Sequence, residues 1–171
     1  MPQNFVLETE RLRLRPYRPD DLDKLEAILG DPETMRYYPE PYGRERVLEW
    51  IEDNIRRYAE DGTGLWAMEL TSTGEFAGNC GPAVRAVEGV PEVELGWHVK
   101  RALWGRGLAP EAAAACRDWA FEHLGTDRVI SLIRTENVPS RRVAEKIGMT
   151  IDREVAYGSM GWPHLVYMIR R

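Results

Sequence analysis

The sequence is poor in the residues that build metal sites and disulfide frameworks. It has two cysteines and three histidines among 171 residues, and neither set shows a ligand-like spacing. Cys80 falls in a predicted strand and Cys116 among helical alanines, where a free thiol usually behaves as a small buried hydrophobic group. We therefore expect two free, buried thiols and no bound metal.

Basic residues in excess and long apolar runs are also lacking. Lys and Arg number 23 against 28 Asp and Glu, so the formal net charge of −5 gives no general attraction to nucleic acid or anionic membrane. No apolar run reaches about 18 residues, and the N-terminal MPQNFVLETERL lacks the apolar core of a signal peptide. We expect a soluble, cytoplasmic protein with no nucleic-acid or membrane partner.

The sequence does contain the alternation of strands and helices typical of an α/β domain. With 171 residues and 43% hydrophobic content, a single domain spanning residues 1–171 can bury roughly 70% of its unfolded surface. Successive strands, followed by strand, helix and strand, indicate a mixed sheet with an antiparallel first part and a parallel crossover. Strands are expected at 7–16, 65–70, 76–80, 95–99, 128–133, 150–155 and 165–169. Helices are expected at 19–29, 31–36, 44–59, 109–124 and about 139–147, with loose segments at 37–43 and 82–91.

Two N-terminal segments carry more specific expectations. The run RLRLR is expected to put its leucines and arginines on opposite faces of a half-buried strand. The proline-broken loop YYPEPYG brings together Tyr37, Tyr38 and Tyr42. These tyrosines either line a substrate opening or cover an edge of the core.

The stretch ELGWHVKRALWGRGLAPE, residues 94–111, is typical of a strand, a bend and a new helix. Gly105 and Gly107 bracket Arg106 in the bend, and Pro110 and Glu111 suit the first helical turn. Free N–H groups and the positive end of the helix dipole meet there, which favours a phosphate or pyrophosphate; plain turn geometry is the alternative. A P-loop and a dinucleotide fingerprint are disfavoured, because their Lys-Ser/Thr pair and third glycine are missing.

The stretch TENVPSRRVAEKIGM, residues 135–149, predicts a second helix start. Pro139 suits a first helical position and Gly148 a C-terminal stop. Taken alone, this stretch is explained if Asn137 caps the helix and Ser140 occupies its first turn.

Together the two stretches resemble the GNAT N-acetyltransferases. Gly105, Arg106 and Gly107 match the second half of motif A, (Gln/Arg)xxGx(Gly/Ala), although Ala102 stands at its first position. The form WGRGLAPEA is similar to the branch that contains the ribosomal-protein alanine N-acetyltransferases and their small-molecule-modifying relatives. The later arrangement NxxSxxxxxKxGM resembles the family's segment after strand five. The resemblance extends over most of the chain.

The resemblance implies the GNAT fold, an α/β (α+β) arrangement in which helices flank a mixed, splayed β-sheet of about seven strands. Acetyl-CoA is the implied cosubstrate, with its arm entering as a pseudo-strand between parallel strands that part near Val99 and Ile133. Main chain would hold the pantetheine, and the bend would hold the diphosphate. The implied binding residues are Trp97, His98, Val99, Trp104, Gly105, Arg106, Gly107, Leu108, Ala109 and Asn137.

Acyl transfer to an amine needs a neutral nucleophile, a polarised carbonyl and a proton for the departing thiolate. An α-amine is roughly a third neutral near pH 7.5, a lysine on the order of 0.1%. Glu94 is the candidate base, although it also suits the polar side of a half-exposed strand. His98, on the same strand face, is the second candidate base. The resemblance implies Ser140 as proton donor, with Tyr157 second.

The favoured function is transfer of an acetyl group from acetyl-CoA to a primary amine by direct attack in a ternary complex. The acceptor is a protein N-terminal α-amine or a small-molecule amine, and the net acidity favours cationic or neutral amines. A non-catalytic acyl-CoA-binding or sensing module on the same fold is the alternative. Trp50, Trp66 and Trp162 either form more apolar surface than a monomer needs or are buried, and a homodimer is implied mainly by the resemblance.

Overall fold

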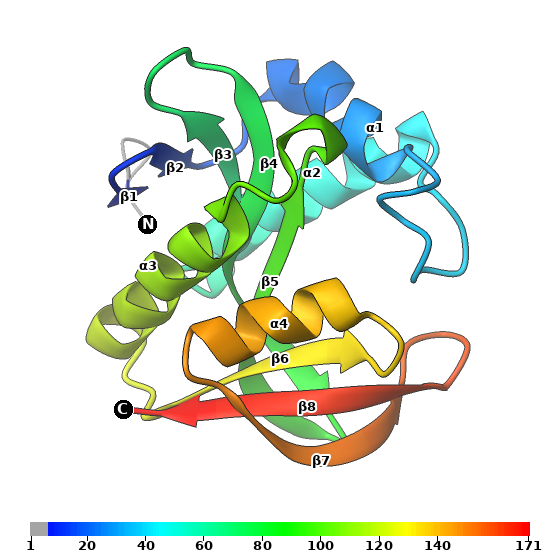
Figure 1. Ribbon diagram of the computed structural model, residues 1–171, viewed down its shortest axis with the longest axis vertical. Helices are drawn as coiled ribbons and strands as arrows, with labels where there is room; N and C mark the ends of the chain where they lie inside the picture. The colour runs from blue at the N-terminus through cyan, green and yellow to red at the C-terminus, as the bar shows by residue number, and fades with distance from the viewer. Residues whose placement is uncertain (1–6) are drawn as a thin grey trace.

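A single sheet organises the computed structural model, which describes residues 7–171 (Figure 1). Its eight strands lie in the order β1-β2-β3-β4-β5-β6-β8-β7. They are β1 (Leu7–Glu8), β2 (Leu12–Arg15), β3 (Trp66–Leu70), β4 (Phe76–Val87), β5 (Val90–Val99), β6 (Arg128–Arg134), β7 (Thr150–Tyr157) and β8 (Trp162–Arg170). The helices are α1 (Leu22–Leu29), α2 (Arg44–Glu60), α3 (Leu108–His123) and α4 (Val138–Lys146), with 3₁₀ turns at Pro19–Asp21 and Arg101–Leu103. In Figure 1, α3 and α4 lie in front of the sheet and α2 lies behind it.

The sheet changes from antiparallel to parallel between β5 and β6. Strands β1 to β5 pair antiparallel in sequence, whereas β5 and β6 are parallel and connected through α3. Within residues 7–171 these two strands share one register pair, Glu94 with Ile130, beside which Ser131 Oγ donates to the Leu95 carbonyl at 2.7 Å. Beyond this junction they run apart (Figure 1). The mixed, splayed sheet is thus confirmed, with eight strands instead of about seven.

The helices expected from apolar periodicity are confirmed to within a few residues, but two N-terminal expectations were wrong. Residues 7–16 form two paired strands instead of one, because the Thr9 N–H donates to the Leu12 carbonyl at 2.9 Å and closes a turn. The short helix expected after α1 is replaced by turns. There Asp31 Oδ2 accepts hydrogen bonds from the Thr34 N–H at 2.9 Å and hydroxyl at 2.7 Å, a cap on a turn that does not continue into a helix before Pro39.

The segment 82–91 was expected to be loose and is instead part of the long β4–β5 hairpin. The hairpin is paired along its length, up to a two-residue turn. Glu88 and Gly89 form this turn with φ of 50° and 80°, and positive φ at both central residues is what a type I′ turn requires. Pairing with a neighbouring strand therefore outweighs the local signal of the prolines.

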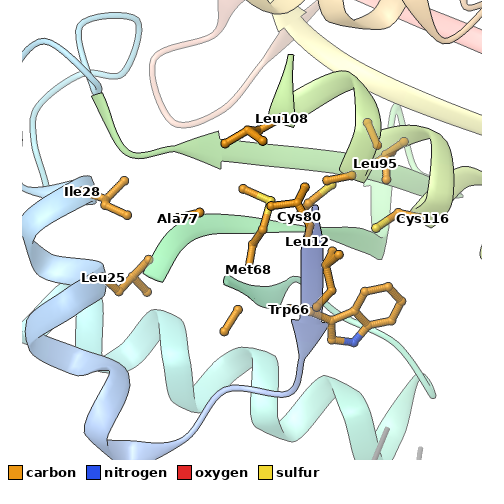
Figure 2. Close-up of a cluster of buried hydrophobic side chains, with 14 of the residues drawn as sticks. Leu12, Leu25, Ile28, Trp66, Met68, Ala77, Cys80, Leu95, Leu108 and Cys116 are labelled. Atoms are coloured by element: carbon orange, nitrogen blue, oxygen red, sulfur yellow. The ribbon is translucent and has the colours of Figure 1, made fainter. Parts of the chain in front are cut away.

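The core lies between the sheet and its helices. Figure 2 shows Trp66, Met68 and Cys80 from the strands in one buried cluster with Leu108 and Cys116 of α3. The two cysteines are free and buried, as expected, and burial raises the pKa of the Cys116 thiol well above its ordinary value. Trp66 is fully buried, so of the two interpretations of this residue the buried one is confirmed.

A buried ion cluster fastens the start of the chain to the sheet. Arg15 and Asp21 are 4% and 0% exposed, and the guanidinium donates to both Asp21 carboxylate oxygens, at 2.7 and 2.8 Å. Arg15 Nε also donates to Glu69 Oε1 of β3 at 3.0 Å. Burial alone would raise the pKa of Asp21, but hydrogen bonds from Arg15 and the Arg18 N–H outweigh it and hold this pKa below its ordinary value. The arginine expected on the polar face is therefore a core residue.

This cluster predicts a pH-dependent loss of stability in Asp21→Asn. The substitution leaves a buried guanidinium short of a partner, so urea denaturation at pH 7 should show a loss of about 3 kcal/mol. Because the folded pKa of Asp21 is lowered, its ionised form contributes above the unfolded pKa, and the gap between wild type and variant should close as pH falls below about 4. Asp23→Asn is the matched control, since its side chain is exposed. Equal loss in both variants would contradict the assignment.

Candidate active site

The bend between β5 and α3 depends on two left-handed glycines. Gly105 and Gly107 have φ of +75° and +76°, a conformation in which a Cβ costs about 1–2 kcal/mol. Gly107 is the N-cap of α3, and no side chain caps this helix in the described chain. The first N–H groups of α3 are therefore free to meet a ligand, at the positive end of the helix dipole.

A network from the N-terminal strands holds this bend from behind. Arg11, in the turn between β1 and β2, donates to the carbonyls of Arg106 at 2.8 Å and Gly107 at 3.4 Å. Its Nε donates to Glu111 Oε2 at 2.7 Å, and Thr9 Oγ1 donates to Glu111 Oε1 at 2.6 Å. We name these contacts the Arg11–Glu111 clamp.

The clamp sets the direction of the bend's N–H groups. In a trans peptide the C=O and the following N–H point in opposite directions. Carbonyls held on Arg11 therefore turn the N–H groups of Gly107 and Leu108 to the other side, where both residues line a cavity. Our sequence reasoning identified the glycines but missed Arg11, because no local pattern links residues 95 positions apart.

A first cavity of about 320 Å³, the bend cavity, extends from this bend past β5 to α4. Of the predicted binding residues, those that line it are Trp97, His98, Val99, Trp104, Gly105, Gly107, Leu108, Ala109 and Asn137. Arg106 is not among the lining residues; its side chain is exposed and its carbonyl faces the clamp.

A second cavity of about 330 Å³ lies beside the first, and we name it the aromatic cavity. Its walls carry Tyr37, Tyr38, Tyr42, Trp50, Trp97, Tyr157 and Trp162. The tyrosines of the 37–43 loop thus border an opening, although Tyr42 is also 8% exposed and packs in the core. The two cavities meet at residues common to both, which are Tyr37, Tyr38, Trp97, His98, Asn137 and Ser140.

Asn137 and Ser140 lie at this meeting point, at the start of α4. Asn137 Oδ1 accepts a hydrogen bond from the Ser140 N–H at 3.2 Å, so the capping role is confirmed. Both residues nevertheless line both cavities. Capping fixes their positions, and the two interpretations of this motif are compatible.

Glu94 and Tyr157 line the aromatic cavity away from the bend. Burial raises the pKa of Glu94, while Arg85, whose Nε donates to Glu94 Oε2 at 3.2 Å, offsets part of this effect. A carboxylate with a raised pKa is a stronger base. Burial also raises the pKa of Tyr157, so its phenol stays protonated at neutral pH.

His98 is placed at the meeting point but both of its ring nitrogens are engaged. Nδ1 lies 3.0 Å from Asn79 Oδ1, and Nε2 lies 2.8 Å from the Tyr38 hydroxyl. Because an amide oxygen only accepts, Nδ1 carries the proton and the Nε2 lone pair accepts from Tyr38. Burial lowers the pKa of His98 to about 4, so the ring is neutral near pH 7. This arrangement suits holding Tyr38 and its loop in place better than accepting a proton from an amine.

The described residues contain neither a group of metal ligands nor a membrane-spanning helix. Across residues 7–171 no group of three or more His, Cys, Asp and Glu side chains is arranged to hold a metal ion. In the same part of the chain no helix combines the length and apolarity needed to cross a bilayer.

Comparison with known proteins identifies the family. Residues 11–150 match the acetyltransferase (GNAT) domain. The uncharacterized protein YkkB of Bacillus subtilis (strain 168) is 37% identical over 150 residues, which cover 87% of each chain. An acetyltransferase from Agrobacterium tumefaciens str. C58 is 33% identical with a TM-score of 0.85, covering 98% of this chain and 95% of its own. RimL, a ribosomal L7/L12 alpha-N-protein acetyltransferase in complex with coenzyme A, shares the fold at 14% identity, with a TM-score of 0.78 over 97% of this chain and 98% of its own. The chain therefore belongs to the GNAT acetyltransferase family.

Proposed function

We propose that this GNAT protein, as a single domain, moves an acetyl group from acetyl-CoA to a primary amine by direct attack in a ternary complex. The observation that carries the proposal is the meeting of two cavities at the gap between β5 and β6. One cavity begins at the glycine bend, whose free N–H groups suit an anion, and the other is lined by the carboxylate of Glu94. Such a pair suits a donor entering from one side and an acceptor from the other.

The donor side is supported by the main chain of β5. The Leu95 carbonyl accepts from Ser131 and the Val99 carbonyl accepts from Trp104 Nε1 at 2.7 Å. Since these carbonyls face away from β4, the period of two along a strand directs the main-chain groups of Trp97 the same way. Trp97 can therefore pair with an extended pantetheine arm, and the N–H groups of Gly107 and Leu108 can bind the diphosphate. The Val99 carbonyl, engaged by Trp104, is excluded from that pairing.

The chemical step needs two proton movements, and the cavities offer a residue for each. The acceptor nitrogen forms a bond to the acetyl carbon, the C–S bond breaks, and the amine loses one proton. Glu94 accepts that proton, directly or through water, because its raised pKa favours protonation. Ser140, which lines both cavities, hydrogen-bonds the departing sulfur and donates its hydroxyl proton to it while taking up a proton from water. Tyr157 is the second candidate donor, since its phenol stays protonated in the aromatic cavity.

Release of CoA thiol with a panel of primary amines tests this function. Ser140→Ala should lower kcat on the order of 10²-fold, with little change in the KM for acetyl-CoA, because the hydroxyl acts on the departing sulfur. Ser72→Ala, in the hairpin turn after β3, is the control and should match wild type. Binding of acetyl-CoA without turnover on any amine would favour the non-catalytic acyl-CoA-binding module instead.

The Arg11–Glu111 clamp predicts that removing Arg11 weakens only the binding of the diphosphate. Arg11→Ala frees the bend carbonyls, so the KM for acetyl-CoA should rise about tenfold, or about 1.4 kcal/mol. Acetyl-pantetheine lacks the diphosphate, and its kcat/KM should stay within about twofold of wild type. The matched control is Arg13→Ala, two residues along, whose partner is the exposed Glu8. An equal fall with both donors would mean that Arg11 only supports the fold.

A further inference from the structure

The aromatic cavity has a charge opposite to that of the whole chain. Its lining, within the described residues, contains three guanidinium groups, those of Arg46, Arg85 and Arg134, against one carboxylate, that of Glu94. The chain as a whole has a formal net charge of −5. A local excess of this kind raises the local concentration of anionic ligands.

Two of these arginines lie on aromatic walls of the cavity. The Arg46 Cζ is 3.8 Å from the centre of the Tyr42 ring, and the Arg134 Cζ is 4.0 Å from that of Trp162. Stacking holds each guanidinium by its face and leaves edge N–H groups, which match a carboxylate or phosphate in a bidentate manner.

The acidic partners of these two arginines are largely exposed and do not line the cavity. Glu40 lies 3.8 Å from Arg46, which is beyond hydrogen-bond distance, and its side chain is 74% exposed. Glu136 accepts two hydrogen bonds from Arg134, from Nε at 3.3 Å and from Nη2 at 3.1 Å, and its side chain is 59% exposed against 16% for Arg134. The Arg46–Glu40 pair is exposed on both sides and contributes at most about 1 kcal/mol, so an anionic ligand can replace Glu40. A ligand that binds Arg134 has to displace Glu136 from a two-point contact.

The third arginine has a different partner inside the cavity. Arg85 Nε donates to Glu94 Oε2, and both side chains are largely buried. This pair neutralises itself in part, which leaves Arg46 and Arg134, whose acidic partners lie outside the lining, as the cationic points of the cavity. The cavity therefore has an acidic point at Glu94, suited to an amine, and cationic points on its aromatic walls.

We infer that the acceptor is a small primary amine that also carries a carboxylate or phosphate. Arg46 and Arg134 hold the anionic group, and Glu94 faces the amine. This inference rests on the proposed function and names its acceptor class. A volume of about 330 Å³ suits a small molecule, and the aromatic walls favour an apolar or planar body between the two charged ends. The net charge of the chain led to the expectation that cationic or neutral amines are favoured. The acceptor, however, contacts the lining of the aromatic cavity, in which positive groups outnumber negative ones.

Matched acceptors test the inference with acetyl-CoA as donor. The carboxylate series is phenylalanine, phenylalaninamide and phenethylamine; the phosphate pair is O-phosphoethanolamine and ethanolamine; spermidine and an N-terminal peptide complete the panel. Values of kcat/KM are expressed per concentration of neutral amine, because a neighbouring anion changes the amine pKa. At least one anionic acceptor should exceed its uncharged counterpart by at least tenfold, and whether the carboxylate or the phosphate arm responds identifies the anion.

Arginine variants separate charge recognition from structure. Arg46→Gln and Arg134→Gln should each raise the KM for anionic acceptors about tenfold and leave kcat/KM for neutral acceptors within twofold. The control is Arg44→Gln on the same helix as Arg46, which pairs with Asp23 and Glu26 outside the cavity. Thermal unfolding confirms that all variants fold.

The remaining outcomes overturn the inference in distinguishable ways. Faster turnover of neutral amines, spermidine or the peptide would overturn the acceptor class and leave the acetyltransferase activity in place. A uniform fall in kcat/KM for every acceptor in the arginine variants would also overturn the acceptor class and leave the acetyltransferase activity in place. Acetyl-CoA binding without turnover on any amine would overturn the acceptor class and the proposed function together.

Discussion

The site depends on the way β5 and β6 separate after one shared register pair. Parallel strands in a regular sheet satisfy each other's main-chain groups along their length. Here the Ser131–Leu95 hydrogen bond closes the junction, and the strands then part. The main chain of β5 beyond Leu95 is left with groups that β4 does not use. The sheet therefore diverges between β5 and β6, and an extended ligand can pair with the main chain of β5 there.

The second requirement is a bend whose N–H groups face that position. Two left-handed glycines permit the bend, and the clamp from the N-terminal strands turns its carbonyls away from the ligand side. Glu111 is positioned by Arg11 and Thr9 as well as by the helix dipole. The N-terminal strands therefore fix the direction of the bend, although they lie at the far edge of the sheet from α4 (Figure 1).

Local sequence was sufficient for features whose causes are local. The bend glycines, the helices with apolar stripes and the Asn137 cap follow from backbone preference and periodicity, and the structure confirms them. The motif resemblance led to the splayed sheet. Features that depend on distant partners were missed. Arg15 is buried because Asp21 and Glu69 satisfy its guanidinium, and residues 82–91 are paired because β5 lies beside them. The positive lining of the aromatic cavity was also missed, because its arginines come from three elements distant in sequence, α2, β4 and β6.

The most direct test of this account is amide hydrogen exchange with and without CoA. If β5 pairs with the pantetheine arm and the bend binds the diphosphate, CoA should protect the amides of Trp97, Gly107 and Leu108. Amides of the hairpin turn at residues 71–74 should be unchanged. Binding of CoA that protects the bend but leaves β5 exchanging at its free rate would contradict the claim that the gap between β5 and β6 is the ligand's place.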